Sequence, residues 1–593
     1  IAKVLAKEGV DPNAAEEPRF KFVKDLSKID PKLPIKPAAK GEGFDFRMIS
    51  SYFADYGDPL ASDGAESSFP DGLLQRLAAQ NVNAVWMHVV LNTLVKDPKY
   101  PEFGVGSEMR IANLKKLVQR AKKFGIKVYL YMNEPRSVSV SFFDVPGREK
   151  MRGVVEDNRA IAAMCTSSEE TRRWLRDSLT SLFSQVKGLG GVFTITMSEN
   201  LTSCASHRQQ ASCERCRGRS VADIVAEVNT VIAEGVAAGD PSAETIVWNW
   251  SWPKGLEDEV FSRLPKKNCR VLHVSENGIP VTVGDKTVEA HDYSIAIGGP
   301  GENAKSYWAK AAKFNLPAVA KVQACCSWEL SSFPYIPVMD LVSEHAARLR
   351  AEGVKGVMLS WSCGSAPALN LRVFGGDSLD EIANDIYGKK AAPLVRKAWT
   401  AFSEGFKHYP YEVVVAYKGP QQWGPANVLY RKPTGYQATM VGIPYDGLGF
   451  GRWDNKWNGR FPIGPWIERF EKVANGFEEG CRLFALAVPE VANTDLRAAA
   501  KRELDMFKAQ AMHFRAIVNQ SKFILERNKA NIAGMNKFAK LELEMAKQYL
   551  PLVRADSRIG YECTNHYYYV PLDVVEKIVG CSMIIDETER HLK

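Results

Sequence analysis

The chain has 593 residues, 45% of them hydrophobic and 25% charged, the composition of a globular protein long enough for two or three domains. Its 77 basic and 69 acidic residues leave a formal net charge of +8, and no block of Lys or Arg is present, which argues against nucleic-acid binding. No apolar stretch reaches the ~20 residues that a membrane-spanning helix needs. Since the first residue is Ile1, a secreted or periplasmic location and a cytoplasmic one both remain open.

Most of the chain alternates between two kinds of segment. Residues 1–43 are charged and proline-containing, which predicts a leader that wraps over the surface. Short runs rich in β-branched and aromatic residues then alternate with amphipathic helical segments, the pattern of parallel strands joined by crossover helices in an α/β fold. The eight strand-like runs lie at 44–53, 81–90, 127–135, 191–200, 245–253, 270–277, 318–330 and 356–362. We predict a (β/α)₈ TIM barrel over 44–400, in preference to a doubly wound open sheet.

The composition changes after the barrel. Residues 401–475 are rich in Gly, Pro and aromatic residues, which predicts a long ordered loop or small subdomain that could act as a lid or binding surface. Residues 476–593 contain long helical segments and a tyrosine-rich turn, RIGYECTNHYYY. The simplest prediction is a helical C-terminal domain that packs on the barrel.

Two of the predicted strands end in a glutamate. Glu199 ends the fourth strand, in GVFTITMSEN, and Glu329 follows Trp328 at the end of the seventh. Barrel enzymes build their active sites at the C-terminal ends of the strands, and a pair of carboxyl groups there can cleave a glycosidic bond. We therefore predict Glu199 as the acid/base and Glu329 as the nucleophile or charge stabiliser. The alternative for Glu199 is a glutamate that caps the loop or pairs with an arginine, and the alternative for Glu329 is a structural salt bridge.

Other polar and aromatic residues near the strand ends could bind a sugar. Amide and guanidinium groups bind hydroxyls, and indole rings stack on the apolar faces of sugars. Glu134 and Glu276 are also reserves for either catalytic role, although each residue of this set could equally belong to the scaffold. The predicted substrate contacts are Asn133, Glu134, Arg136, His88, Trp250, Glu276, Asp292, Tyr293, Trp328 and Trp361.

Cysteines cluster shortly after the fourth strand, in LTSCASHRQQASCERCRGRS. Cys213 and Cys216 have the Cys-x-x-Cys spacing of a zinc knuckle, and Cys204 or His207 could complete a tetrahedral set with Cys165. We predict a structural zinc that stiffens this loop, with a disulfide or free thiols as the alternatives. No cofactor is expected for catalysis, because the strand ends lack the His-x-His spacing of a metal-dependent hydrolase.

Two segments carry a resemblance to a known family. KKFGIKVYLYMNEP and GVFTITMSEN resemble the third and fourth strands of the hexosaminidase barrels of glycoside hydrolase family 20. The resemblance implies that Glu199 is the acid/base and that the preceding residue orients the substrate's acetamido group, which acts as nucleophile. That residue is Asp in the family and Ser198 here. The chain also resembles the large retaining clan with glutamates at the ends of strands four and seven, which matches Glu199 and Glu329.

Stretches such as SENLTSC, CERC and SWELSSFPYIPV further resemble uncharacterised bacterial family-20-like proteins. We predict a glycoside hydrolase that removes a terminal, β-linked sugar from a glycan by a retaining mechanism. A β-N-acetylhexosaminidase that uses the substrate's acetamido group is the first alternative. A non-catalytic carbohydrate-binding barrel is the second, and a homo-oligomer is compatible with each.

Overall fold

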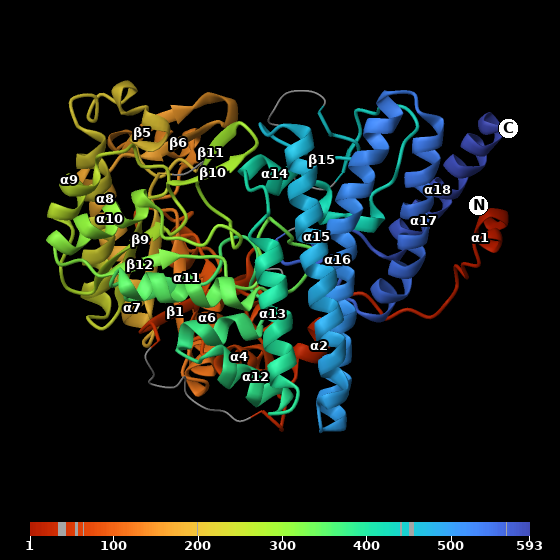
Figure 1. The fold of residues 1–593 in the computed structure, drawn as a ribbon. Coiled ribbons are helices and arrows are strands. Elements are labelled where there is room, and N and C mark those ends of the chain that lie inside the picture. The colour runs from red at the N-terminus through yellow and green to blue at the C-terminus, as the bar shows by residue number, and fades with distance from the viewer. Residues whose placement is uncertain are drawn as a thin grey trace.

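The computed structural model describes residues 1–33, 43–53, 57–62, 64–197, 200–438, 442–449, 456–564 and 566–593. A barrel surrounded by helices forms one part of the molecule, and a group of long helices packs beside it (Figure 1). The N-terminal segment runs between the two parts. Helix α1 (Ala2–Lys7) contacts the last helix, α18 (Pro571–Leu592), whereas α2 (Lys21–Ser27) contacts α4 (Asp71–Ala79) beside the barrel.

Eight strands form a closed parallel barrel in the order β1-β13-β12-β9-β8-β7-β3-β2. Strand β1 closes it, because Met48 pairs with Ala84 of β2 and Phe46 pairs with Gly356 of β13. The predicted (β/α)₈ fold is thereby confirmed. The strands are β1 (Phe46–Ile49), β2 (Ala84–His88), β3 (Lys127–Met132), β7 (Gly191–Ile195), β8 (Glu244–Trp248), β9 (Cys269–Val274), β12 (Ala318–Lys321) and β13 (Gly356–Met358).

Several strands are shorter than the sequence predicts. The seventh strand, β12, ends at Lys321, and the apolar run that follows it is a buried loop with no regular ladder. Burial rather than strand pairing makes that run apolar, and composition alone does not separate the two cases. Glu329 therefore lies eight residues beyond its strand instead of at its end.

Helices cover the outside of the barrel, each burying one face against the strands. The sequence marks some of their ends clearly: α8 begins with a capping box in which Ser220 Oγ accepts from the Asp223 amide and the Asp223 carboxylate accepts from the Ser220 amide. The other helices here are α3 (Gly64–Ser68), α5 (Leu91–Leu94), α6 (Ser107–Lys123), α7 (Glu169–Gln185), α8 (Val221–Gly239), α9 (Glu257–Arg263), α10 (Glu302–Lys313), α11 (Met339–Ala351) and α12 (Leu379–Tyr387).

Two small antiparallel sheets are inserted after barrel strands. A three-stranded sheet follows β3, and a hairpin with a Gly284-Asp285 turn follows β9, where Gly284 supplies the positive φ of +61° that such a turn favours. Both insertions enlarge the side of the barrel where the strands end. Their strands are β4 (Val138–Ser139), β5 (Arg152–Glu156), β6 (Ile161–Met164), β10 (Ile279–Val283) and β11 (Lys286–Ala290).

Long helices form the second part of the molecule. Helices α13 and α15 approach closely at Gly405 and Gly476, where an added Cβ on Gly405 would lie 2.7 Å from the Gly476 Cα. Within the described ranges no helix is long and apolar enough to cross a bilayer. The elements are α13 (Ala392–Phe406), α14 (Val413–Lys418), β14 (Gln437–Ala438), β15 (Ile443–Pro444), α15 (Ile463–Ala487), α16 (Thr494–Asn528), α17 (Ile532–Ala555), β16 (Tyr561–Glu562), β17 (His566–Tyr567) and α18.

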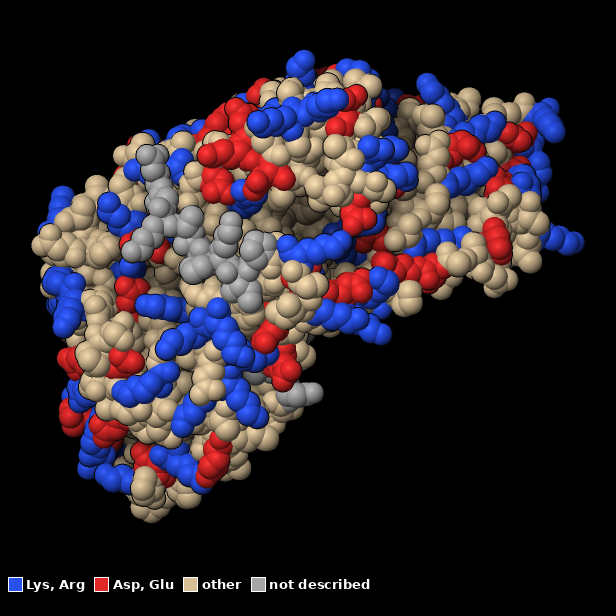
Figure 2. All heavy atoms as spheres, turned by 90° about the horizontal axis from the view of Figure 1, so that it is seen from below, with Lys and Arg blue, Asp and Glu red and all other residues tan. Residues whose placement is uncertain are grey.

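Basic and acidic side chains are mixed over the barrel and over the long helices on the face that Figure 2 shows. This distribution agrees with the small net charge of the sequence.

Candidate active site

The mouth of the barrel, where the strands end, has an aromatic floor. The rings of Trp86 and Trp361 stack with centroids 5.3 Å apart and planes at 24°, and Trp248 meets Trp361 edge-on at 5.0 Å. Trp250 lies 6.2 Å from Trp361, and both rings are only partly buried. The two predicted sugar platforms Trp250 and Trp361 are thus brought together. Trp86 is not among the predicted sugar contacts. Trp86 belongs to β2, and its ring stacks on that of Trp361.

A cavity of about 240 Å³ opens over β1, β2 and β13. His88 and Trp361 line it, and so do Cys563 and Thr564 from the turn between β16 and β17. Thr564 Oγ1 donates a hydrogen bond to the Ser362 carbonyl oxygen, and the Cys563 thiol donates to the same oxygen at 3.5 Å. The C-terminal part of the chain therefore supplies one wall of the mouth, and His88 faces the cavity as a substrate contact requires.

A second cavity, of about 440 Å³, lies over the ends of β8 and β9. Trp250 and Asp292 line it, together with the polar side chains of Asn277, His291 and Asn303. An aromatic wall facing amide and carboxylate groups is the lining that a sugar ring needs.

Glu276 is a buried carboxyl beside the second cavity. It lies two residues beyond β9, is 0% exposed, and neither Oε1 nor Oε2 has a hydrogen-bond partner among the described residues. Its neighbour Asn277 lines the cavity, whereas Glu276 itself lies behind the lining. Burial raises the pKa of Glu276 to about 8, with Lys321 opposing the rise and Asp292 adding to it. An unpaired buried carboxyl is costly to keep in a fold, and groups with such perturbed pKa values concentrate at functional sites.

Asp292 and Lys321 form a buried ion pair next to Glu276. Lys321 ends β12, is 0% exposed, and places its Nζ 4.3 Å from the centre of the Tyr293 ring. Asp292 Oδ2 has no partner among the described residues, and burial raises the pKa of Asp292 while Lys321 opposes the rise. Lys321 escaped prediction because a single Lys in the apolar run AVAKV is expected to point to solvent. Here the lysine points inward and is neutralised by a carboxylate of the neighbouring loop.

Glu329 is fully buried, and its carboxylate is occupied by protein donors. It accepts hydrogen bonds from Ser294 Oγ at 2.6 Å, Ser327 Oγ at 2.7 Å, the Ile295 amide at 2.7 Å and the Ala296 amide at 3.3 Å. Burial raises the pKa of Glu329 to about 7, and these donors oppose the rise. Like Glu276, Glu329 is not among the residues that line either cavity, so the donors are what distinguish the two carboxyls. This geometry favours a structural role, in which the carboxylate joins the loops that follow β11 and β12, over the predicted nucleophile role.

The predicted contacts Asn133, Glu134 and Arg136 follow β3, and they hold the neighbouring loops together. Glu134 is 1% exposed and accepts from the amides of Leu91 and Arg136, each at 2.7 Å. Burial raises the pKa of Glu134 to about 7. Asn133 donates to the Ile195 carbonyl at 3.0 Å and accepts from Asn200 Nδ2 at 3.4 Å. Glu134 therefore connects the end of β3 to the segment after β2, and Asn133 connects it to the end of β7 and the segment after it.

Glu199, the predicted acid/base, lies outside the described residues, together with Ser198. The described residues on either side fix where the chain enters and leaves: Met197 is buried, and Asn200 is hydrogen-bonded to Asn133. In the sequence, Glu199 follows the last residue of β7 by four positions.

Trp328 packs away from both cavities. Its ring meets the Tyr417 ring edge-on at 4.8 Å and lies 6.4 Å from the Tyr293 ring. Tyr417 belongs to α14, in the predicted lid region. Trp328 and Tyr293 are therefore core residues beneath that region.

The predicted cysteine ligands come together. Cys204, Cys213 and Cys216 lie with Cys165 in one buried group, and His207 is exposed and outside it. Of the two residues predicted as alternatives for the fourth position, Cys204 lies in this group and His207 does not.

The fold is similar to those of solved glycoside hydrolases. A family 138 enzyme that targets pectin rhamnogalacturonan II matches with a TM-score of 0.54 and 12% identity, covering 94% of this chain and 86% of that one. A family 89 enzyme from Clostridium perfringens, in complex with GlcNAc-α-1,4-galactose, matches with a TM-score of 0.49 and 11% identity. The match covers 92% of this chain and 64% of that one. A β-N-acetylhexosaminidase matches with a TM-score of 0.38 and 12% identity, covering 61% of this chain and 78% of that one.

At these identities the likeness concerns the fold. No protein-family model and no curated protein sequence matches the chain. The predicted resemblance therefore holds at the coarser level of a glycoside hydrolase fold and is not specific to family 20.

Proposed function

We propose that this protein is a glycoside hydrolase whose active site is the aromatic mouth of the barrel. The observation that carries the proposal is Glu276, a buried carboxyl without a protein partner among the described residues, beside a cavity walled by Trp250 and Asp292. The fold similarity to a family 138 glycoside hydrolase supports the same class of reaction.

The proposed carboxyl pair is Glu199 and Glu276. Strands β7 and β9, which lead to these residues, are separated by β8 alone in the barrel. Neighbouring strands lie about 4.8 Å apart, so the ends of β7 and β9 lie about 10 Å apart. The proposed retaining mechanism requires the two carboxyl groups to come within about 5 Å of each other. Glu329 is the weaker partner, because its carboxylate is already satisfied by four donors.

In this mechanism Glu199 protonates the glycosidic oxygen while Glu276 attacks the anomeric carbon, and the bond to the leaving group breaks. Glu199 then removes a proton from water, and the water displaces Glu276 to release the sugar. Trp250 and Trp361 would stack on the sugar ring. Asp292 and Lys321 would hold one negative and one positive charge next to the Glu276 carboxyl. A terminal, β-linked sugar remains the proposed substrate.

The test is a panel of aryl glycosides of common sugars, in both anomers and with and without an N-acetyl group. Wild type is compared with Glu199→Gln, Glu276→Gln and Glu329→Gln. We expect one sugar to be cleaved, with loss of at least about 10²- to 10⁴-fold in kcat for the first two variants. Full activity of Glu276→Gln on every cleaved sugar would overturn its role.

The same panel separates the alternatives. If only N-acetylated sugars are hydrolysed, and Glu276→Gln keeps that activity, the substrate's acetamido group acts as the nucleophile. Glycan binding in calorimetry without turnover would indicate a non-catalytic barrel. Azide rescue assigns the roles, because azide replaces a missing nucleophile and gives a glycosyl azide of inverted configuration, whereas rescue of a missing acid/base gives the retained one.

A further inference from the structure

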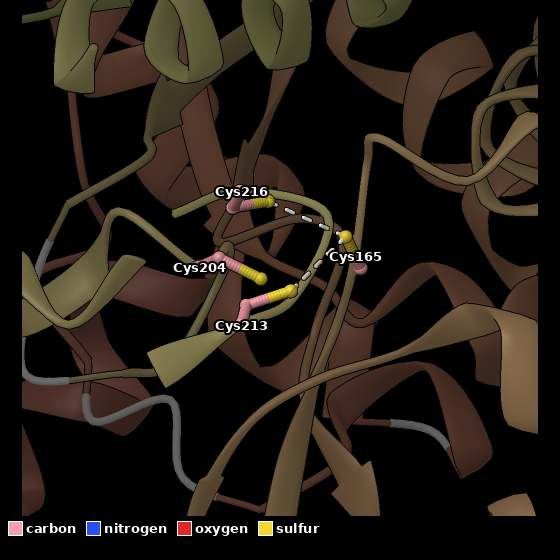
Figure 3. Close-up of side chains that lie close together, drawn as sticks. All are labelled: Cys165, Cys204, Cys213 and Cys216. Carbon is pink, nitrogen blue, oxygen red and sulfur yellow. Dashed lines mark hydrogen bonds between the residues drawn. The ribbon is translucent and has the colours of Figure 1, made fainter. Parts of the chain in front are cut away.

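Four cysteines from separate segments converge in the interior next to the mouth of the barrel. Cys165 follows β6, Cys204 lies in the segment after β7, and Cys213 and Cys216 form a turn before α8. Their sulfurs point toward one another (Figure 3), and all four Sγ atoms lie within 4.8 Å of each other. We propose that these four thiolates bind one Zn²⁺ ion in a closed tetrahedral site.

The sulfur separations match a metal site better than a disulfide. Cys165 Sγ lies 3.8 Å from Cys213 Sγ and 3.5 Å from Cys216 Sγ. Zinc held tetrahedrally by Zn–S bonds of about 2.3 Å requires S···S separations of about 3.8 Å. A disulfide would bring two sulfurs to about 2.05 Å and leave the other two without a role. One central ion therefore accounts for the close approach of all four sulfur atoms.

The local backbone has the shape of a zinc knuckle. Within Cys213-Glu214-Arg215-Cys216 the amides of Cys216 and Arg217 both donate to the Cys213 carbonyl, at 3.0 and 2.8 Å. This tight turn directs two sulfurs to the same side. The site is also closed to solvent, because all four cysteines are at most 5% exposed. A closed set of four sulfur ligands is that of a structural rather than a catalytic zinc.

Cationic and hydroxyl groups surround the sulfurs. Zinc with four thiolates carries a net charge of −2, which needs compensation in a buried place. Arg215 interacts with Cys165 from within the knuckle. Arg219 donates to Ser167 Oγ at 2.7 Å, and that hydroxyl lies 3.3 Å from Cys216 Sγ. Such outer groups orient the ligands and moderate their charge.

The site joins the insertion after β3 to the loop after β7. Gly153 of β5 approaches so closely that an added Cβ would lie 2.6 Å from Cys204 Sγ. Cys204 is five positions beyond Glu199, and Thr202 between them donates to the Thr196 carbonyl at 2.6 Å. On the proposed function, the ion would therefore anchor the far end of the loop that carries the acid/base.

The test is the metal content of the purified full-length chain, expressed with zinc in the medium and handled without chelators. We expect one zinc per chain in wild type and in Cys269→Ser, a buried cysteine outside the group, and close to none in Cys213→Ser. The metal content does not depend on finding a substrate. The zinc proposal can therefore fail while the proposed function holds, and the proposed function can fail while the zinc proposal holds.

A second measurement covers the case in which Cys213→Ser does not fold. Wild type expressed with cobalt should show the visible d–d bands and the sulfur-to-metal charge-transfer band of a tetrahedral tetrathiolate. Release of the metal should expose four additional thiols to a thiol reagent. Wild type without bound metal and without the cobalt spectrum, or a disulfide within this group found by mass spectrometry, would overturn the proposal.

Discussion

At the scale of single residues, the mouth of the barrel holds two buried glutamates in opposite states. Glu329 is surrounded by donors, whereas Glu276 has none among the described residues. The hydrogen bonds of Glu329 stabilise the folded state, whereas the unpaired carboxyl of Glu276 destabilises it. Matched substitutions can therefore separate structure from catalysis.

The first prediction concerns Glu276→Gln. An amide has the same shape and no charge, so the variant should be more stable than wild type by about 1–3 kcal/mol above pH 8, where the buried carboxyl would be charged. It should lose activity at the same time. Denaturant unfolding at pH 9 alongside the glycoside assay measures both, and a variant that is less stable and fully active would contradict the assignment.

The second prediction concerns Glu329→Gln. Its new amide N–H₂ would replace one carboxylate oxygen and would face either the Ser294 hydroxyl, which donates to Oε1, or the Ile295 amide, which donates to Oε2. We expect a loss of about 1–3 kcal/mol in the free energy of unfolding. Activity per folded molecule should stay within a few-fold of wild type, and a selective loss of kcat without loss of stability would return the nucleophile role to Glu329.

The third prediction is a pH profile. A nucleophile acts as the ionised form, and burial raises the pKa of Glu276 to about 8. We expect kcat/KM, which reports the free enzyme, to rise about tenfold per pH unit below that value until the carboxyl is ionised. An ascending limb that is already complete near pH 5 would argue against Glu276 as nucleophile.

At the scale of elements, the barrel was predictable because its signal is local and repeated. Each strand is a short apolar run followed by an amphipathic helix, and eight repeats leave few alternatives. The cysteine site was partly predictable, since Cys213 and Cys216 have a diagnostic spacing. Its first ligand, Cys165, comes from 48 positions before Cys213, and spacing alone does not place it next to the others.

Other features depend on contacts between loops, and these the sequence does not reveal. The donors to Glu329 come from Ser294 and Ile295, about 35 positions away, so the strand-end pattern alone made the residue look reactive. Lys321 faces inward only because Asp292 meets it. A local pattern shows which residues are unusual, and the fold decides whether a partner neutralises them.

The fourth prediction tests the join between β5 and the cysteine site. Gly153→Ala would place a Cβ 2.6 Å from Cys204 Sγ, so it should destabilise the protein by about 1–3 kcal/mol and speed zinc loss to a chelator. Gly218→Ala is the matched control, because its Cβ would meet nothing within 4 Å. Equal behaviour of the two variants would show that the contact has no influence on the site.

At the scale of the whole molecule, buried titratable groups set the pH range of stability. Burial raises the pKa of Glu134 and Glu329 to about 7 and that of Glu276 to about 8, above their usual 4.5. The folded state then holds protons that the unfolded state has lost, so stability falls as pH rises from 4.5 through these values. Buried histidines act oppositely, but only below pH 6.5, because their pKa values are lowered to about 3; they are His273, His345 and His513.

The fifth prediction follows from these signs. Between pH 6.5 and 9 the carboxyls act without opposition from the histidines, so Tm should fall over this range. The fall should be smaller in Glu276→Gln, which has lost the carboxyl with the highest pKa of the three. Thermal scans at constant ionic strength measure both, and a Tm that rises from pH 6.5 to 9 would contradict the burial of these groups.

The wall that the β16–β17 turn gives to the mouth has a consequence for biosynthesis. The last barrel strand ends at Met358, and Cys563 follows it by 205 positions. At about 5–20 residues per second, a ribosome needs roughly 10–40 s more before Cys563 and Thr564 can close the cavity. During that interval the nascent barrel has all its strands but lacks one wall of its aromatic mouth, so the rings there stay open to solvent or to a chaperone. A chain that terminates before Cys563 keeps this pocket incomplete.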